Sequence, residues 1–546
     1  MIRAAAVAAA GALLWAGHAN AARFAVGVDP SSLPRVAAQL RQLGTVDRDL
    51  APLDVLVVSS PRARGMRRID GVRWVEWLGS HRRLAFTPTD PLVTKQWYLQ
   101  QVHAFDFWPD APVLPPVKVA VVDSGIDAAH PDLASRIVLS RTFVGGSIAD
   151  SEGHGTFVAG EIAAAMNNSE GIAGIGFPVQ LLVAKVVRAD GSVSLEAEAS
   201  AIRWAADNGA RVINLSLGGL RDPRNPTRDT YSALEAAAID YAVAKGAVVV
   251  AAVGNGDQAP KSPWPYASYP AALPHVIGVS AVARDGSVPA FSDRDAVFND
   301  IAAPGEDIFS TLPRALTRDN PTCLDQGYSD CGPVDFRAAE GTSFAAPQVT
   351  AAAALLRAQA PALTADQTAS LIERTADDLN ASNGCVTCPL LRDSLSGWGR
   401  LNIARALAVA SRGAPPAADR FETNDDAGTD AARIGGTRGR VAATVDYWDD
   451  QTDVYSIDLA AGQKLTASLT GAAGTAVQLL LWSPRTRTVF GAPSRGLAVA
   501  RSVRTGARQR VVYTAPPAKG GRYYVDVRIV QPGAGRYALT WAKTRR

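Results

Sequence analysis

Three segments of the chain carry the residue types that nucleophilic catalysis requires. Asp123 ends an apolar run, His154 stands 31 residues later among glycines, and Ser343 follows after another 189 residues. A serine hydroxyl becomes a nucleophile when an imidazole takes its proton, and a carboxylate can orient that imidazole and stabilise its charged form. Together the three residues predict acyl transfer through a serine. Serine hydrolases of different folds use the same three residues in different orders along the chain. The order Asp, His, Ser is typical of one of these classes and differs from that of two others.

Each segment taken alone has a simpler interpretation. Asp123 could be a turn residue before Gly125, a lone histidine is more often structural, and Ser343 fits the N-cap of a helix. The glycines around His154 superficially resemble a dinucleotide-binding loop, but the apolar strand that precedes such a loop is missing. The catalytic interpretation therefore depends on the combination. A serine at a helix start also has backbone N–H groups directed toward it.

The elements that must position these residues lie in residues 91–412. Apolar runs alternate with helical stretches there, which predicts an α/β domain with a doubly wound, mostly parallel sheet covered by helices on both faces. Polar residues cluster at the carboxyl ends of the runs, where such sheets place their active crevice. The expected strands are 117–122, 212–217, 247–253 and 276–282, and the expected helices are 195–208, 232–245 and a stretch beginning at Ser343.

The flanking segments differ in character. Residues 1–21 combine a positive end, an apolar stretch and a small-x-small site, which predicts a secretory signal peptide rather than a buried helix. Residues 22–90 read as a small α+β domain that is marginally stable alone. Residues 413–419 form a Pro/Ala-rich linker. Residues 420–546 contain short alternating strands with glycine-bearing turns, which predicts a β-sandwich.

Composition excludes several classes of protein. The chain has 546 residues, of which 47% are hydrophobic and 20% charged, as in globular proteins of several domains. The net charge of +3 conceals +5 in residues 1–90, −11 in 91–419 and +9 in 420–546. A uniformly basic nucleic-acid binder and a disordered chain are therefore not expected. Beyond the start, every apolar run is shorter than the ~18 residues of a membrane helix, so the mature chain is expected to lack a transmembrane segment.

The chain has four cysteines, and an exported protein folds where disulfides persist. Four cysteines allow three pairings. The local pairs Cys323–Cys331 and Cys385–Cys388 are favoured because each lies in a short polar loop. A cysteine-only zinc site and a redox pair at Cys385 and Cys388 are the weaker alternatives, because one pair alone has ligand spacing and no thioredoxin-like unit surrounds it.

Three blocks make about residues 91–410 resemble the subtilisin-like serine proteases: Asp123-Ser124-Gly125-Ile126-Asp127, His154-Gly155-Thr156 and Gly341-Thr342-Ser343-Phe344-Ala345-Ala346-Pro347. The resemblance implies a subtilisin-like fold and a serine endopeptidase that acts on polypeptides and needs no cofactor for its chemistry. Ser343 would form the acyl-enzyme, His154 would move the proton and Asp123 would hold the imidazole. Asn255 matches the family's side-chain donor in the oxyanion hole, and the Ser343 backbone N–H would be the second donor.

The same resemblance assigns substrate-binding segments. Ser216, Leu217 and Gly218 resemble the strand that pairs with substrate and lines the primary specificity pocket. Ala252, Val253 and Gly254 would form the other wall, and Ser268-Tyr269-Pro270 the far end. No acidic residue stands in these segments, which favours an apolar or broad side-chain preference.

A structural calcium site is implied more loosely. Asp132 and Asn168, the latter in loop 166–172, resemble a family site built from carboxylate, amide and backbone oxygens. The loop is one residue longer than the commonest form, so its exact ligands stay open. The alternative interpretation is a solvated turn.

The flanks also resemble known companions of this fold. Residues 22–90 are similar to a propeptide that assists folding and then blocks the cleft as an intramolecular inhibitor. Residues 420–546 resemble a bacterial pre-peptidase C-terminal domain, on segments 419–425 and 453–457. A monomeric, secreted or periplasmic, self-processed endopeptidase is therefore expected. The alternatives are a pseudo-protease that binds peptides without cutting them, and an adhesive or polysaccharide-binding protein that acts through residues 420–546.

Overall fold

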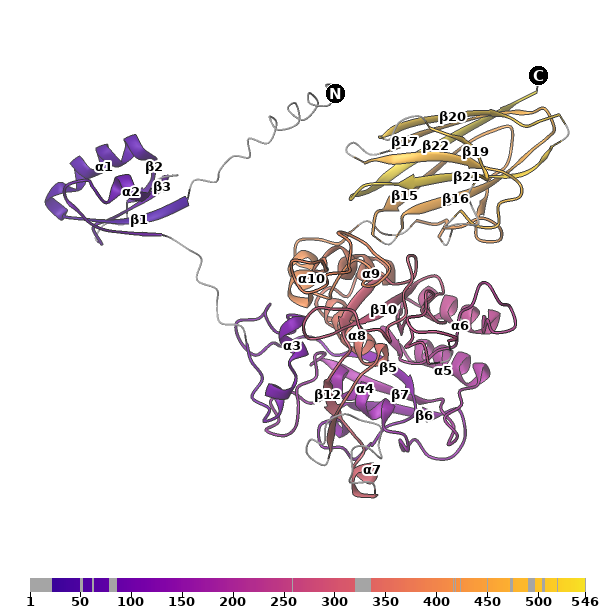
Figure 1. Cartoon of the computed structure of the whole chain (residues 1–546), viewed down its shortest axis with the longest axis horizontal. Coiled ribbons are helices and arrows are strands. Elements are labelled where there is room, and N and C mark those ends of the chain that lie inside the picture. Colours follow the sequence, from indigo (N-terminus) through magenta and orange to yellow (C-terminus); the bar gives the residue numbers. More distant parts are fainter. Residues whose placement is uncertain are drawn as a thin grey trace, which may run out of the picture. The chain divides into compact units, whose positions relative to one another are not determined.

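The computed structural model divides the chain into two units, Met1–Leu84 and Ala85–Arg546, and each is described here by itself (Figure 1). It describes residues 22–49, 53–60, 63–77, 86–257, 259–319, 335–415, 417, 419–422, 424–448, 450–471, 475–489, 496–502, 506–517 and 519–545. The expected signal peptide, residues 1–21, lies outside this range. The secondary-structure elements below are labelled as in Figure 1.

The first unit is a four-stranded antiparallel sheet covered by a helix. Its order is β2-β3-β1-β4. Helix α1 buries Val36 and Leu40, which are four residues apart and so lie on one face, against Phe24 and Val26 of the sheet. The α+β organisation expected here is present. The elements are β1 (Ala22–Val28), η1 (Pro30–Ser32), α1 (Leu33–Leu43), β2 (Thr45–Asp49), β3 (Val55–Ser60), α2 (Ala63–Met66) and β4 (Val72–Trp77).

The second unit contains a seven-stranded parallel sheet in the order β11-β10-β9-β8-β5-β7-β6. Its inner strands are almost continuously apolar because both faces of the sheet are covered. This confirms the predicted fold class. The strands are β5 (Val117–Asp123), β6 (Ile137–Thr142), β7 (Val179–Lys185), β8 (Val212–Leu215), β9 (Val248–Ala252), β10 (Val276–Val282) and β11 (Ile301–Pro304).

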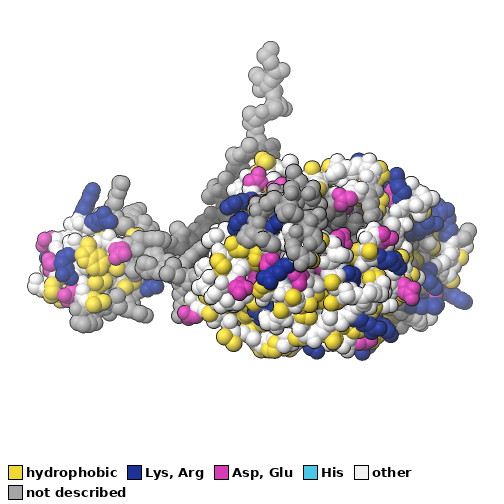
Figure 2. Space-filling model, turned by 90° about the horizontal axis from the view of Figure 1, so that it is seen from below, with side chains coloured by type: hydrophobic (Ala, Val, Ile, Leu, Met, Phe, Trp, Pro, Cys, Tyr) yellow, Lys and Arg dark blue, Asp and Glu magenta, His cyan; other side chains and the backbone are white. Residues whose placement is uncertain are grey.

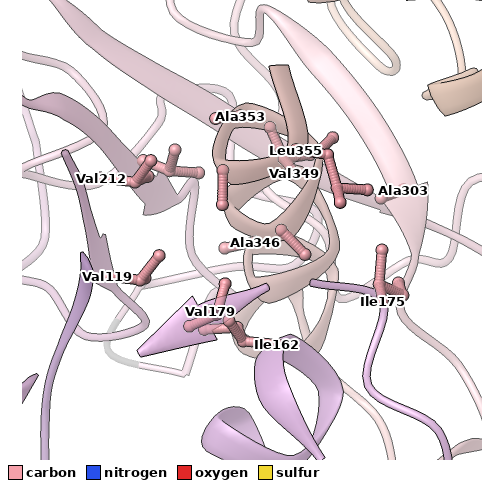
Figure 3. Close-up of a cluster of buried hydrophobic side chains, with 14 of the residues drawn as sticks. Val119, Ile162, Ile175, Val179, Val212, Ala303, Ala346, Val349, Ala353 and Leu355 are labelled. Atoms are coloured by element: carbon pink, nitrogen blue, oxygen red, sulfur yellow. The ribbon is translucent and has the colours of Figure 1, made fainter. Parts of the chain in front are cut away.

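Alternate residues of each strand enter two separate cores. Val119 and Val121 of β5 pack with α4 (His154–Ala163) and α8 (Thr342–Gln359), and Figure 3 shows part of this cluster. Ala120 and Val122 pack with α5 (Leu195–Asp207) and α6 (Ala233–Ala244) on the other face. This two-residue alternation is what a strand covered on both sides requires. The remaining helices of the domain are η2 (Val93–Lys95), α3 (Tyr98–Gln101), η3 (Ala134–Arg136), α7 (Arg314–Asp319), α9 (Ala365–Arg374) and α10 (Ile403–Ala410), and a hairpin pairs β12 (Ile308–Thr311) with β13 (Phe336–Ala339).

Residues 432–544 form two further sheets that share one core. The orders are β14-β16-β21-β18-β19 and β15-β22-β17-β20, and every pair is antiparallel except β14 with β16. Tyr455 and Ile457 of one sheet meet Val441 and Ala443 of the other, which is the packing of a sandwich. The strands are β14 (Ala432–Arg433), β15 (Arg438–Asp446), β16 (Thr452–Leu459), β17 (Lys464–Gly471), β18 (Val477–Trp482), β19 (Ala498–Arg501), β20 (Arg508–Thr514), β21 (Gly521–Ile529) and β22 (Ala534–Thr544).

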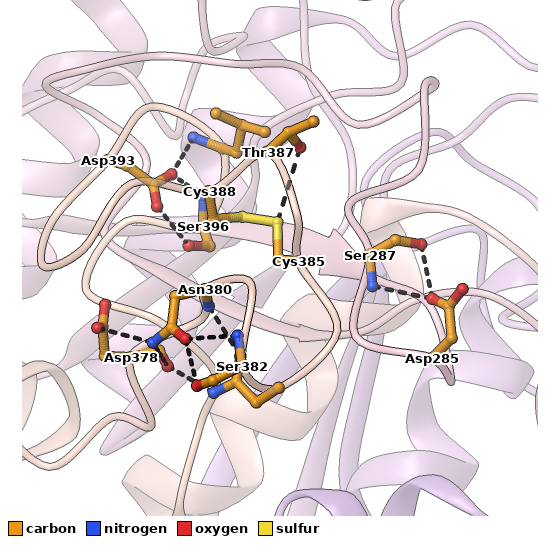
Figure 4. The surroundings of a disulfide bond; sticks show 12 residues. Asp285, Ser287, Asp378, Asn380, Ser382, Cys385, Thr387, Cys388, Asp393 and Ser396 are labelled. Carbon is orange, nitrogen blue, oxygen red and sulfur yellow. Dashed lines mark hydrogen bonds between the residues drawn. A yellow bond between two sulfur atoms is a disulfide. The ribbon is translucent and has the colours of Figure 1, made fainter.

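One of the two expected disulfides falls within the described residues. Cys385 and Cys388 are bonded and buried, and Figure 4 shows polar loop residues around them. Asp393 holds the neighbouring turn by accepting hydrogen bonds from the backbone and hydroxyl of Ser396 at 2.9 and 3.1 Å. Cys323 and Cys331 lie outside the described residues, so their pairing stays a prediction.

One face of the molecule shows how charged and apolar side chains are distributed on it (Figure 2). On the face of the molecule seen in Figure 2, basic and acidic side chains alternate with apolar and neutral ones. Of the helices within the described ranges, none is both long enough and apolar enough to cross a bilayer.

Candidate active site

The three predicted catalytic residues stand at the ends of neighbouring elements. Asp123 is the last residue of β5, His154 is the first residue of α4, and Ser343 is the second residue of α8. His154 Nδ1 lies 2.8 Å from Asp123 Oδ1, which also accepts a hydrogen bond of 2.7 Å from the Ser124 backbone. The Asp123 side chain is only 2% exposed, against 26% for the imidazole. A buried carboxylate thus holds one ring nitrogen, while part of the ring remains accessible.

The charge of His154 depends on its acidic neighbours. Burial lowers the pKa of His154, but the charge and hydrogen bond of Asp123, with smaller contributions from Glu152 and Asp150, outweigh it and raise the pKa to about 9. The imidazolium that forms when the ring accepts a proton is therefore stabilised.

Asp150 fixes the loop that leads into α4, and sequence reasoning missed it. Its Oδ1 accepts hydrogen bonds from the Ser124 hydroxyl at 2.8 Å and from Gly153 N at 2.8 Å. Its Oδ2 accepts from the backbone and hydroxyl of Thr156 at 2.8 and 2.7 Å. The Ser124 hydroxyl in turn accepts from Gly155 N at 2.8 Å. One carboxylate thereby ties the Asp123 turn to the start of the His154 helix.

Gly155 permits the close approach of these two segments. A Cβ at this position would lie 2.3 Å from the Gly125 carbonyl oxygen and 3.1 Å from Asp123 Cβ. Any larger residue would push α4 away from β5. The glycine beside the histidine is therefore a packing requirement of the Asp123–His154 contact.

Ser343 is hydrogen-bonded to Ser216, the residue that follows strand β8. Its backbone carbonyl accepts a hydrogen bond of 2.7 Å from the Ser216 hydroxyl, and its own hydroxyl donates to the Ser216 carbonyl at 3.3 Å. Among the hydrogen bonds of the described residues, the Ser343 hydroxyl uses this acceptor rather than His154. The imidazole stands beside the same helix, with its ring 5.4 Å from that of Phe344. Catalytic hydrogen bonds are often long or misaligned without substrate, so this orientation of the hydroxyl is compatible with a serine–histidine pair.

The Asn255 side chain is oriented by Thr342, which sequence reasoning also missed. Asn255 Oδ1 accepts hydrogen bonds from the backbone and hydroxyl of Thr342 at 2.9 and 2.8 Å. This fixes the amide so that its Nδ2 group is the donor left for a ligand. Thr342 and Ser343 also open α8, whose first backbone N–H groups face an anion favourably.

A cavity of about 160 Å³ lies beside Ser343. Of the six residues predicted for its two walls, four line it, and Ser268 of the predicted far end lines it as well. Ser216 instead holds Ser343, and the Val253 side chain packs in the core with α5 and α6. Asp293, which lies outside every segment singled out from the sequence, also lines the cavity. The lining residues are Leu217, Gly218, Gly219, Leu220, Ala252, Gly254, Asn255, Gly256, Asp257, Ser268, Asp293, Thr342 and Ser343.

The predicted calcium residues come together, joined by Asp90. Asp132 Oδ1 accepts a hydrogen bond of 2.7 Å from Asn168 Nδ2, and its Oδ2 accepts one of 3.0 Å from Ile172 N. The Asp90 carboxylate accepts from the backbone of Asn167 and Asn168 at 3.0 and 3.2 Å. Asp132 and Asp90 are 0% and 2% exposed. Burial, and less strongly the charge of Asp90, raise the pKa of Asp132. The two buried carboxylates suit a hard cation such as Ca²⁺. The Asn168 amide turns its nitrogen toward Asp132, and its oxygen accepts a hydrogen bond of 3.0 Å from Glu170 N.

A second acidic group lies in the C-terminal region. The carboxylates of Asp419, Glu422 and Asp453, and those of Glu422, Asp425 and Asp450, come within 4.8 Å of one another. Burial raises the pKa of Glu422 to about 8 and that of Asp425 to about 7, with further repulsion from neighbouring acids. Protons or a bound cation would relieve this repulsion.

The fold and the site together define a serine hydrolase of the α/β class. Residues 116–399 match the Subtilase family (Peptidase_S8). Thermitase of Thermoactinomyces vulgaris is 35% identical over 301 residues, which are 54% of this chain and 94% of thermitase. Subtilisin DY of Bacillus licheniformis is 37% identical over 49% of this chain and 85% of its own length. A solved structure of proteases from Pseudoalteromonas arctica PAMC 21717 is 26% identical, with a TM-score of 0.47, and covers 60% of this chain and 100% of that chain. The chain belongs to the subtilase family and is a serine protease.

The pKa of His154 predicts an alkaline activity profile. The imidazole must be neutral to accept the Ser343 proton, so kcat/KM should rise with pH and level off above about 9. Glu152→Gln removes one negative charge that raises the pKa of His154. The rise of kcat/KM with pH should therefore occur at lower pH in this variant than in wild type. Glu196→Gln, an exposed change at the start of α5, should leave the profile in place. Identical acid limbs for Glu152→Gln and wild type would contradict the prediction.

Proposed function

We propose that the chain is an exported precursor of an endopeptidase, which hydrolyses peptide bonds through an acyl-enzyme on Ser343 and removes residues 22–90 itself. The observation that carries this proposal is the 2.8 Å contact between His154 and Asp123, beside the serine that opens α8. The test is whether a Ser343→Ala precursor keeps residues 22–90 when the wild type loses them.

The site residues divide the reaction between them. Ser343 Oγ attacks the substrate carbonyl carbon while its proton passes to His154 Nε2. The same proton then goes to the leaving amine, which completes the acyl-enzyme. Water attacks the ester, again giving its proton to His154, and the second product leaves as a carboxylic acid while Ser343 regains its hydrogen. Asp123 holds Nδ1 and balances the positive charge of the ring during each transfer.

The developing oxyanion requires donors placed in advance. Asn255 Nδ2 and the Ser343 backbone N–H are the donors that this site supplies, and Thr342 prevents the amide from turning. Such preorganised donors contribute most in a site that excludes water. They stabilise the tetrahedral intermediate more than the planar carbonyl of the bound substrate. Only such a difference lowers the barrier to the reaction.

The remaining parts of the proposal concern export and maturation. Residues 1–21 would direct the chain out of the cytoplasm, to the periplasm or beyond. The α+β domain of residues 22–90 would act as an intramolecular inhibitor until it is cleaved. The sandwich of residues 420–546 would accompany the protease as a pre-peptidase C-terminal-like domain, and the mature protein would be a monomer that acts on polypeptides.

Calcium at Asp90, Asp132 and Asn168 would stabilise the catalytic domain without entering its chemistry. In a Ser343→Ala background, which avoids self-digestion, added Ca²⁺ should raise the melting temperature, because a ligand at 100 times its Kd adds about 2.7 kcal/mol to the free energy of unfolding. Asp132→Asn should lose most of this response, whereas Asp190→Asn, at an exposed turn, should keep it. An undiminished response of the Asp132→Asn protein would assign the calcium effect to another site.

A further inference from the structure

Asp293 places a buried carboxylate in the specificity cavity. It lies on the loop after β10, almost forty residues beyond Asn255, yet its side chain lines the same cavity as Gly218, Gly254 and Ser343. The residue is 1% exposed. The cavity wall therefore carries an acid that the flanking motifs do not contain.

Glycine in the cavity wall lets this carboxylate reach the cavity. Asp293 N donates a hydrogen bond of 3.0 Å to the Gly254 carbonyl, which fixes the loop against the wall. A Cβ on Gly254 would lie 2.4 Å from Asp293 Oδ2, and one on Gly256 would lie 3.4 Å from Oδ1. Gly254 also has a φ of +105°, a conformation that side chains disfavour. The backbone at Gly254 and Gly256 therefore leaves the space that the Asp293 carboxylate occupies.

The carboxylate is incompletely satisfied. The Ser268 hydroxyl stands 3.5 Å from Oδ2, while Oδ1 accepts no hydrogen bond of ordinary geometry from the described residues. Burial raises the pKa of Asp293 to about 8, although the N–H of Gly256 and the Ser268 hydroxyl act in the opposite direction. Such a group is costly to keep charged unless a cation comes to it.

The charged groups nearby do not neutralise Asp293. Arg221 is paired with Asp295, two residues along the same loop, at 2.8 Å. Asp257, which also lines the cavity, adds a second negative charge and opposes ionisation of Asp293. The cavity therefore offers two carboxylates to whatever enters it.

We propose that Asp293 makes the cavity selective for a lysine or arginine side chain at the residue whose carbonyl Ser343 attacks. This inference rests on the proposed function and names its substrate class. An ammonium or guanidinium group that enters the cavity supplies the missing donors, whereas an apolar side chain buries the carboxylate without a partner. Sites built to pair a polar group discriminate strongly against ligands that lack it. The apolar or broad preference favoured by the flanking segments is replaced by a basic one.

The test compares peptides that differ only at the residue before the cleaved bond, with lysine, arginine, leucine or norleucine there. Norleucine has the lysine side chain's apolar part without the ammonium. Wild type should cleave the lysine peptide about 100-fold better in kcat/KM than the norleucine peptide. Asp293→Asn should lower that ratio at least tenfold, mainly by slowing the lysine peptide. Asp285→Asn removes an exposed carboxylate from the same loop after β10 but not from the cavity, and should keep the preference.

A second measurement needs no variant. Against wild type, n-butylamine should inhibit hydrolysis competitively at a lower concentration than n-butanol, because only the amine carries a cation to Asp293. Cleavage of the norleucine peptide as fast as the lysine peptide, or equal inhibition by the two compounds, overturns the proposal while leaving the peptidase function intact. Lysine cleavage that is competitively suppressed by added calcium or sodium would assign Asp293 to a metal cation and also overturn it. Failure to cleave any of the peptides would overturn the proposed function itself.

Discussion

Ser343→Ala protein, purified from an exporting host, should keep residues 22–90 when wild-type protein from the same host has lost them. Intact mass distinguishes the two forms, because the segment is an eighth of the chain. The physical reason is that the acyl-enzyme cannot form without the serine oxygen. His154 and Asp123 act through that oxygen, so their contribution to the rate is lost with it. Hydrolysis of a peptide should fall about 10⁶-fold, the size of effect known for a subtilisin that lacks its nucleophile.

Two controls separate the explanations for this result. Ser411→Ala, an exposed change at the end of α10, should process like wild type. A trace of wild type added to the Ser343→Ala precursor shows whether the segment is cleavable in the folded variant. Loss of the segment from both proteins would assign the processing to a host protease. Its retention by both, together with no peptide hydrolysis, would favour a peptide-binding pseudo-protease.

The sequence predicted the sheet well because burial on both faces leaves a strong signal. The runs 117–122 and 276–282 nearly coincide with β5 and β10. Helix α4, which begins at His154, leaves a weaker signal in the sequence. Glycine has poor helix propensity, and α4 holds two within its first seven residues. Packing overrides propensity here, because a Cβ on Gly160 would lie 2.2 Å from Thr311 Oγ1.

The site was predictable only where short motifs contain its residues. Asp123, His154 and Ser343 stand in recognisable blocks, and their order carried the prediction. Asp150, Thr342 and Asp293 act through contacts that only the folded chain creates. Asp293 shows this best, since its approach to Gly254 requires the loop after β10 to lie against the segment that follows β9. A search of the sequence for acids inside the wall segments could not find it.

Asp123→Asn should reduce kcat about 10⁴-fold while leaving the fold in place. Asparagine has the shape of aspartate, and its Oδ1 can still accept the 2.7 Å hydrogen bond from Ser124 N. It lacks the negative charge that balances the imidazolium, and its amide group favours the wrong tautomer of His154. The activity that remains should titrate at lower pH than in wild type, because the main cause that raises the His154 pKa is gone.

The comparison that gives this result its meaning is Asp127→Asn. Asp127 belongs to the same sequence block, but its carboxylate accepts hydrogen bonds from Ala129 N and Arg314 N at 3.0 and 3.1 Å rather than from the imidazole. Its replacement should change kcat by less than about tenfold and leave the pH profile in place. Rates must be divided by the concentration of folded protein and read by initial velocity at saturating peptide. Equal kcat for Asp123→Asn and wild type would mean that His154 needs no carboxylate, and that the 2.8 Å contact serves only to hold α4 against β5.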